Sequence, residues 1–250
     1  MFGQKQTYNM MFISVLVGLL TANVTSADNI VGNGGFEVAD TGGPEDSAMW
    51  NESTSTFSEL EGDSHARSVR KLGSIRPGGL YVHHLETATR NANSWASASI
   101  TQNTTTDAGQ PSLQPGDYVY ASFDAIVDND YWGWIRISLD IVNGIGGVVA
   151  SRQQQFTTYL GDPGYFDTRF GLGNIQVPEF GPAPADWYSA SLTISVFSFV
   201  GPSDPFGESV GEAFIDNVEI YTGPVPYPEP SSLVLFGGAG LLLFRRCRAN

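Results

Sequence analysis

The stretch Tyr131-Trp-Gly-Trp-Ile-Arg-Ile-Ser-Leu-Asp-Ile141 alternates regularly between two kinds of side chain. Side chains at positions i and i+2 of a β-strand point to the same face. One set is apolar and consists of Gly133, Ile135, Ile137, Leu139 and Ile141. The other set consists of Trp132, Trp134, Arg136, Ser138 and Asp140. The pattern therefore predicts a strand with one face on a hydrophobic core and two tryptophans on the opposite face.

Similar runs of β-branched and aromatic residues lie on both sides of this stretch, with no long amphipathic helical period. They predict further strands at residues 95–101, 118–127, 148–157, 187–199 and 212–221. Turn-forming residues fill 113–117, 128–130 and 143–147, and the Gly- and Pro-rich segment 162–184 predicts a long loop. Since no internal repeat is visible, we expect one all-β domain, a β-sandwich over residues 28–224.

The same alternation places aromatic side chains away from the core in three of these other strands. Aromatic rings beside Asp, Arg and Ser suit a sugar site, because a ring packs on the C–H face of a pyranose while polar groups bind its hydroxyls. The candidate ligand-binding residues are Trp132, Trp134, Tyr120, Trp95, Trp187, Arg136 and Asp124. The alternative is that loops of the sandwich cover these rings, which then form a small satellite core.

The N-terminal residues 1–27 have the pattern of a signal peptide. Lys5 precedes an apolar run at 10–20, and a polar segment with small residues ends at Ala27. The apolar run is too short to cross a bilayer as a helix. We expect cleavage before Asp28 and export of the domain.

The C-terminal residues 225–250 contain three parts in a specific order. Pro228, Glu229 and Pro230 precede the apolar segment 233–244, which is followed by Arg245 and Arg246. This order resembles the PEP-CTERM sorting signal of exosortase substrates, and an ordinary membrane anchor is the alternative. The resemblance implies transient anchoring in the inner membrane and processing by an exosortase. The final location would then be the cell surface, the extracellular matrix or the medium.

The domain between these two ends is strongly acidic. Residues 28–227 contain eight basic and 25 acidic residues, a formal net charge of −17. Such a charge disfavours nucleic acids and anionic lipid surfaces as partners. The one cysteine, Cys247, lies in the tail, so the domain itself can form no disulfide.

Four short motifs occur in the order found in galactose-binding-like jelly-roll domains. They lie at residues 29–37, 113–120, 187–194 and 214–220. The resemblance implies a jelly roll whose first and last strands are joined by a structural calcium ion, with Glu37 and Asp216 among the ligands. Calcium prefers such oxygen ligands. The alternative is that both residues are ordinary carboxylates at strand ends.

No sequence motif indicates an enzyme. The neighbouring His83 and His84 would point to opposite faces of a strand, and the sequence has no nucleophile elbow, zinc motif or phosphate loop. We therefore expect a non-catalytic, exported module that binds polysaccharide. The alternatives are a purely structural protein of a surface or biofilm matrix and a secreted polysaccharide hydrolase or lyase.

Overall fold

The computed structural model describes residues 28–41, 43–58, 64–75, 77, 79–130, 133–157, 164–179, 188–202 and 207–224. Thirteen strands occupy this part of the chain, as the all-β prediction required. They are β1 (Asp28–Asn29), β2 (Ala39–Asp40), β3 (Gly43–Ser47), β4 (Asn51–Phe57), β5 (Ser64–Leu72), β6 (Tyr81–Thr89), β7 (Ser94–Asn103), β8 (Tyr118–Asp130), β9 (Trp134–Asn143), β10 (Val148–Thr157), β11 (Gly164–Gln176), β12 (Tyr188–Val200) and β13 (Ser209–Gly223).

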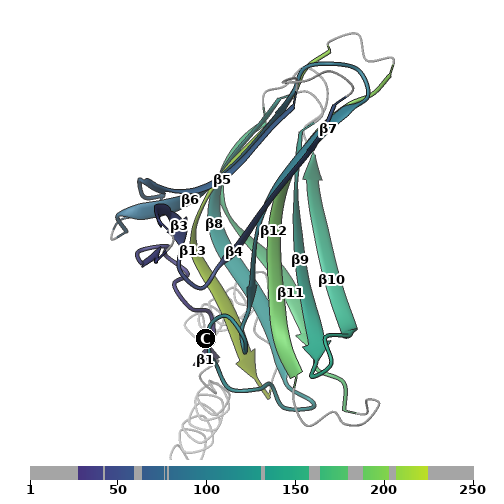
Figure 1. Cartoon of the computed structure of the whole chain (residues 1–250). Helices are drawn as coiled ribbons and strands as arrows, with labels where there is room; N and C mark the ends of the chain where they lie inside the picture. The colour runs from purple at the N-terminus through teal and green to yellow at the C-terminus, as the bar shows by residue number, and fades with distance from the viewer. Residues whose placement is uncertain are drawn as a thin grey trace, which may run out of the picture.

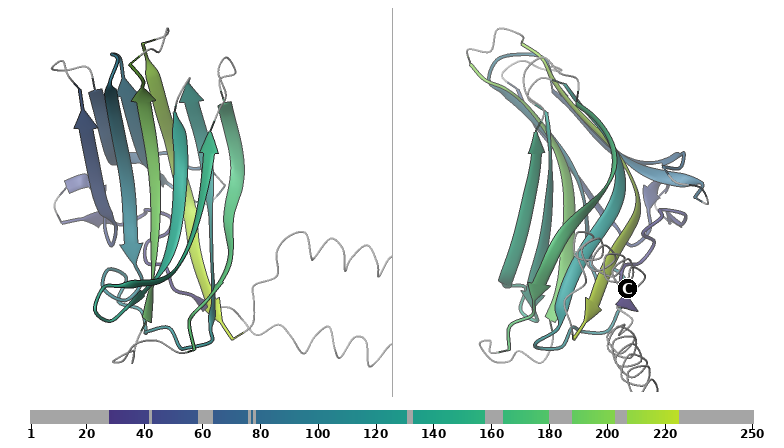
Figure 2. Two further views of the ribbon diagram at one scale, coloured as in Figure 1. Left: turned by 90° about the vertical axis from the view of Figure 1, so that its right-hand side faces the viewer. Right: turned by 180° about the vertical axis from the view of Figure 1, so that it is seen from behind.

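The strands form two main antiparallel sheets that face each other as a sandwich (Figures 1 and 2). The β13 sheet has the order β11-β8-β13-β6-β5, with the short β1 added on β13. The β12 sheet has the order β10-β9-β12-β7-β4, and β2 and β3 form a separate hairpin. The chain crosses between the two main sheets repeatedly, which gives a jelly-roll-like sandwich.

The core lies between the inner faces of the two sheets, and the alternation read from the sequence identifies it correctly. In β9 the buried set is Ile135, Ile137, Leu139 and Ile141. In β8 it is Val119, Ala121, Phe123, Ala125 and Val127, and in β12 it is Tyr188, Ala190, Leu192, Ile194 and Val196. A continuous apolar face on each strand is what a two-sheet sandwich needs.

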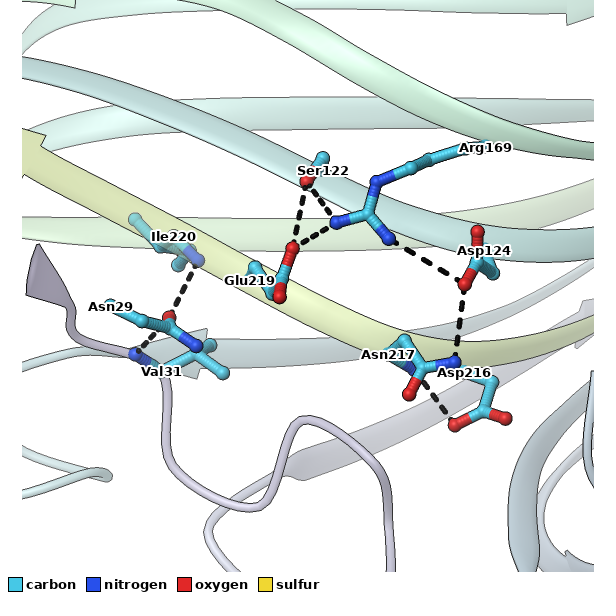
Figure 3. Close-up of polar contacts among 9 residues, drawn as sticks. All are labelled: Asn29, Val31, Ser122, Asp124, Arg169, Asp216, Asn217, Glu219 and Ile220. Atoms are coloured by element: carbon cyan, nitrogen blue, oxygen red, sulfur yellow. Dashed lines mark hydrogen bonds and ion pairs between the residues drawn. The ribbon is translucent and has the colours of Figure 1, made fainter. Parts of the chain in front are cut away.

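The N-terminal motif is fixed to the last strand at an irregularity between Asp216 and Glu219 of β13. The N–H of Val218 donates to the carbonyl of Gly34 over 2.9 Å. Any Cβ at Gly34 would fall 2.0 Å from the Val218 carbonyl oxygen, so this position requires glycine. Asn29 adds a side-chain bond, because its Oδ1 accepts from Ile220 N over 3.1 Å (Figure 3).

Two sequence predictions of local structure are wrong. Most of the expected loop at 162–184 is the strand β11, which pairs with β8 along one edge of the β13 sheet. Its Phe170, Leu172 and Ile175 are buried in the core, so packing outweighs the glycines between them. The expected turn at 128–130 is the end of β8, which continues in register with both β11 and β13.

The predicted signal peptide and the sorting tail, with Pro228, Glu229, Pro230, Arg245 and Arg246, lie outside the described residues. Export and sorting therefore stay predictions from the sequence. Within the part of the chain that the structure describes, no helix has the length and apolar character needed to cross a membrane.

Candidate functional site

The outer face of the β12 sheet is built from rows of residues that lie opposite one another on neighbouring strands. One row is Ser53, Ser99, Ser195, Arg136 and Gln155. The next is Asn51, Thr101, Thr193, Ser138 and Gln153. The Thr101 and Thr193 hydroxyls hydrogen-bond to each other over 3.0 Å. Hydroxyl and amide groups therefore cover most of this face, which is turned toward the viewer in the left view of Figure 2.

Aromatic side chains occupy one end of the same face. Phe57 of β4 lies opposite Trp95 of β7, which lies opposite Phe199 of β12. In the adjacent row, Phe197 of β12 lies opposite Trp134 of β9. We call these five residues the aromatic band. Phe57, Trp95 and Phe199 have exposed fractions of 50%, 38% and 41%, so the band is open to a ligand on three of its four strands.

Arg136 and a ring pair form the end of the band on β9. The rings of Trp134 and Phe197 stack with centroids 5.4 Å apart and an interplanar angle of 11°. The Arg136 guanidinium carbon lies 5.2 Å from the centroid of the Phe197 ring, a cation–π distance. Arg136 also reaches Gln155 Oε1 over 3.4 Å. These contacts orient the exposed Arg136 beside the rings.

The structure divides the predicted ligand-binding residues between the two sheets. Trp95, Trp134 and Arg136 share the outer face of the β12 sheet, whereas Tyr120 and Asp124 lie on β8 in the other sheet. Trp132 and Trp187 lie outside the described residues.

Tyr120 and Asp124 are buried on the outer side of the β13 sheet and are no part of the aromatic band. Tyr120 lies over Gly171, where an added Cβ would be 2.2 Å from the tyrosine hydroxyl. Asp124 Oδ2 accepts from Asn217 Nδ2 over 3.1 Å and pairs with Arg169 at 3.5 Å (Figure 3). The contacts of Asp124 indicate a structural role, because they satisfy a carboxylate with only 3% exposure.

Arg169 connects this network across two strands. Its NH2 atom donates to Ser122 Oγ over 2.8 Å and also contacts Glu219 Oε2, while NH1 faces Asp124 (Figure 3). One guanidinium thus compensates two carboxylates on β8 and β13. These bonds stabilise this face. The same bonds occupy the charged groups of Arg169, Asp124 and Glu219.

The predicted calcium ligands Glu37 and Asp216 do face a common space. A Cβ on Gly79 would fall 3.3 Å from Glu37 Oε1 and 3.5 Å from Asp216 Oδ2, so glycine leaves a small cradle between the two oxygens. Burial raises the pKa of Asp216, the carboxylates of Asp124 and Glu37 raise it further, and N–H donors from Ile75 and Asn217 oppose the rise.

Carboxylate oxygens are the donor type that a calcium ion prefers, and Glu37 Oε1 also accepts the N–H groups of Leu80 and Tyr81 over 2.7 and 3.3 Å. Among the described residues, no group of three or more His, Cys, Asp or Glu side chains has the arrangement of a metal site. A cation placed between Glu37 and Asp216 would offset the repulsion between them.

His83 and His84 point to opposite faces of β6, as the sequence predicted. His83 is buried, and its two ring nitrogens contact Ser47 Oγ and Ser68 Oγ, each over 2.9 Å. Burial lowers the pKa of His83 to about 3. Glu52 Oε1 lies 3.9 Å from His83 Nδ1, and burial raises the pKa of Glu52 to about 7.

His84 lies on the other side of β6. Its ring stacks on Phe214 with centroids 4.5 Å apart, and its Nε2 is 2.6 Å from Glu212 Oε1. Burial lowers the pKa of His84 to about 4, with Lys71 and Arg67 acting in the same direction. In this contact the ring N–H is the donor, because a carboxylate oxygen accepts.

No known family model matches this chain, and neither does any curated protein. Solved structures resemble its fold at low identity. TmCBM61 in complex with β-1,4-galactotriose has 16% identity and a TM-score of 0.42, and the match covers 79% of this chain and 100% of that one.

The enzymatically active domain of bacteriophage CBA120 tailspike protein 4 has 18% identity and a TM-score of 0.47, with 77% of this chain and 21% of that one covered. This chain thus spans about a fifth of the tailspike chain. The Stig cyclase Fisc from Fischerella sp. TAU has 15% identity and a TM-score of 0.40, with 80% and 100% covered. The solved structures that this chain resembles include a carbohydrate-binding module, a tailspike domain and a cyclase.

Proposed function

We propose that the outer face of the β12 sheet binds polysaccharide and that the protein is a non-catalytic surface or matrix module. The aromatic band carries this proposal, because three of its rings are exposed on one sheet face beside rows of hydroxyl groups. Rings bind the C–H faces of sugars and the adjacent hydroxyls and amides bind sugar hydroxyl groups.

The test is binding of the purified full chain to an array of glycans. We expect saturable binding that falls at least tenfold in Trp95→Ala/Trp134→Ala, since loss of one exposed aromatic contact costs about 0.5–1.5 kcal/mol or more. Leu72→Ala, which removes an exposed apolar side chain of β5 on the other sheet, is the matched control. If no glycan binds to the folded protein, a purely structural matrix role replaces this proposal.

We also propose that calcium binds between Glu37 and Asp216 and joins the N-terminal motif to β13. The cradle at Gly79 and the repulsion between the buried Asp216 and the exposed Glu37 support it. Added calcium should raise the melting temperature, and Asp216→Asn should abolish that rise. Glu219→Gln, on the same strand, should keep it. An equal response to calcium in the wild type and in Asp216→Asn would exclude this site.

Export and sorting complete the proposed function. The sequences 1–27 and 225–250 support cleavage before Asp28 and processing at the Pro228-Glu229-Pro230 motif by an exosortase. Mass spectrometry of the protein from a host with and without an exosortase tests both. We expect the mature N-terminus at Asp28 in both hosts and a shortened C-terminus only where the enzyme is present.

A further inference from the structure

The aromatic band runs across the strands of the β12 sheet, and its direction constrains any ligand. Its residues lie on four consecutive strands in the order β4, β7, β12 and β9. Neighbouring strands lie about 4.8 Å apart, so the band from Phe57 to Trp134 extends about 14 Å. If each sugar ring of a bound chain spans about the 4.8 Å between neighbouring strands, the band has room for roughly three rings.

The same face carries almost no free charge, although the domain as a whole is strongly acidic. Of the strand residues on this face, Arg136 and Asp140 are charged. Asp140 accepts from Ser138 over 3.1 and 3.2 Å and from Ser151 over 2.5 Å. Arg136 is held by Gln155 and Phe197. Asp140 is thus engaged by two serines, and Arg136 is the exposed cation among these strand residues.

A polyanion meets two obstacles at such a surface. The net charge of −17 between residues 28 and 227 repels it at long range. The face itself offers one guanidinium, which a single carboxylate could use. A neutral chain meets neither obstacle, and the serine rows beside the band match its hydroxyl groups.

We infer that this face takes an extended, uncharged polysaccharide that lies across the strands, with successive sugar rings along the band from Phe57 to Trp134. The inference rests on the proposed function and adds to it the charge class, the direction and the length of the bound segment. The hydroxyls of Ser55 and Ser97, which oppose each other in the row next to Phe57 and Trp95, lie along its path.

The experiment is calorimetric titration of the full chain with oligosaccharides of two to six residues. The probes are neutral glucan and galactan series and an oligogalacturonate series of the same lengths. For a neutral series, we expect affinity to rise with length up to about three or four residues and then level off. Oligogalacturonates should bind at least tenfold more weakly, and raising the salt concentration should leave neutral binding within about twofold.

Variants at the two ends of the band test its direction. Phe57→Ala and Trp134→Ala should each weaken binding of the longest neutral oligosaccharide by about fivefold, and the level region should begin at a shorter length. Ile145→Ala, which removes an exposed apolar side chain from the turn between β9 and β10, should change nothing. Thermal unfolding of each variant shows that it remains folded.

Three outcomes would overturn the inference while leaving polysaccharide binding intact. They are equal or tighter binding of oligogalacturonates, an affinity for neutral chains that does not depend on length, and wild-type binding by Phe57→Ala. Absence of binding to every probe would instead contradict the proposed function itself.

Discussion

The outer faces of the two sheets use polar residues in opposite ways. On the β13 sheet, Arg169 bonds to both Asp124 and Glu219. Asp124 and Asp216 are almost completely buried. On the β12 sheet, small hydroxyl side chains and exposed rings cover the surface. The comparison shows that charge content alone is a poor guide to a binding surface. Availability of the groups matters more, and the β12 face leaves rings and hydroxyls accessible together.

Gly34→Ala should have the largest effect on stability, because it disturbs the attachment of the N-terminal motif to the β13 sheet. The added Cβ would meet the Val218 carbonyl oxygen at 2.0 Å, so the N-terminal motif must separate from β13. We expect a loss of about 3 kcal/mol or more in the free energy of unfolding, measured by urea denaturation.

Gly35→Ala is the matched control for that variant. Its Cβ would make ordinary contacts, the nearest at 3.7 Å, and it should cost far less. Equal losses in both variants would show that the attachment of this motif to β13 is not specific.

Replacement of Arg169, the cation that bonds to Asp124 and Glu219, should have the next largest effect on stability. Arg169→Met removes the cation that faces the buried Asp124 and the half-buried Glu219, and we expect a loss of about 1–3 kcal/mol in the free energy of unfolding. Arg90→Met breaks the exposed pair with Glu208 and should cost about 0.5 kcal/mol or less. Glycan affinity should be unchanged in both, and a loss of affinity in Arg169→Met would mean that the two faces are coupled.

A pH-dependent effect is expected where the edges of the two sheets meet, at Glu52 of β4. Its folded pKa of about 7 lies above the ordinary 4.5, so the folded state retains a proton that the unfolded state loses. This residue's contribution to stability therefore falls as the pH rises from about 4.5 to about 7.

Glu52→Gln should match the wild type at pH 5 and exceed its free energy of unfolding by about 1–2 kcal/mol at pH 8. Urea denaturation at the two pH values is the measurement, and a difference that does not change with pH would contradict the raised pKa.

The smallest effect is expected from the hydroxyl rows of the β12 face. Ser97→Ala removes one hydroxyl beside Trp95 and should weaken glycan binding about two- to fivefold. The free energy of unfolding should change by no more than about 0.5 kcal/mol. If glycan affinity falls only when aromatic rings are removed, the serine and threonine hydroxyls of this face do not hydrogen-bond to the glycan.

Periodicity predicted the strands whose apolar sets are long and regular. It found 148–157 to the residue and the start of the strand at Tyr118, but it ended that strand three residues early, before Asp130. It missed β4, β5 and β6, which carry many Ser, Thr, His and Arg residues on faces that are only partly apolar. It also missed β11, whose glycines conceal three buried apolar residues.

The candidate site was predictable only in part, since register between strands is not visible in a single sequence. Trp95, Trp134 and Arg136 were found from alternation within single strands, but nothing in the sequence separates them from Tyr120 on the other sheet. Phe197 and Phe199 share the alternation phase of the polar set in 187–199, and that signal was available. Phe57 follows a run of Ser and Thr whose strand is apparent only from its pairing with β7.

The pairing of β1 with the end of β13 determines how the domain responds to mechanical load. Asp28 lies opposite Thr222, so the chain enters and leaves the sandwich at the same place. A force that separates these two points peels β1 from β13 one hydrogen bond at a time. If the domain is instead held at the end of β13 while a ligand pulls on the β12 face, the load acts along β13. Its hydrogen bonds to β8 and to β6 must then break together. A sandwich held by its last strand would therefore resist pulling on a bound polymer far better than pulling on its first strand.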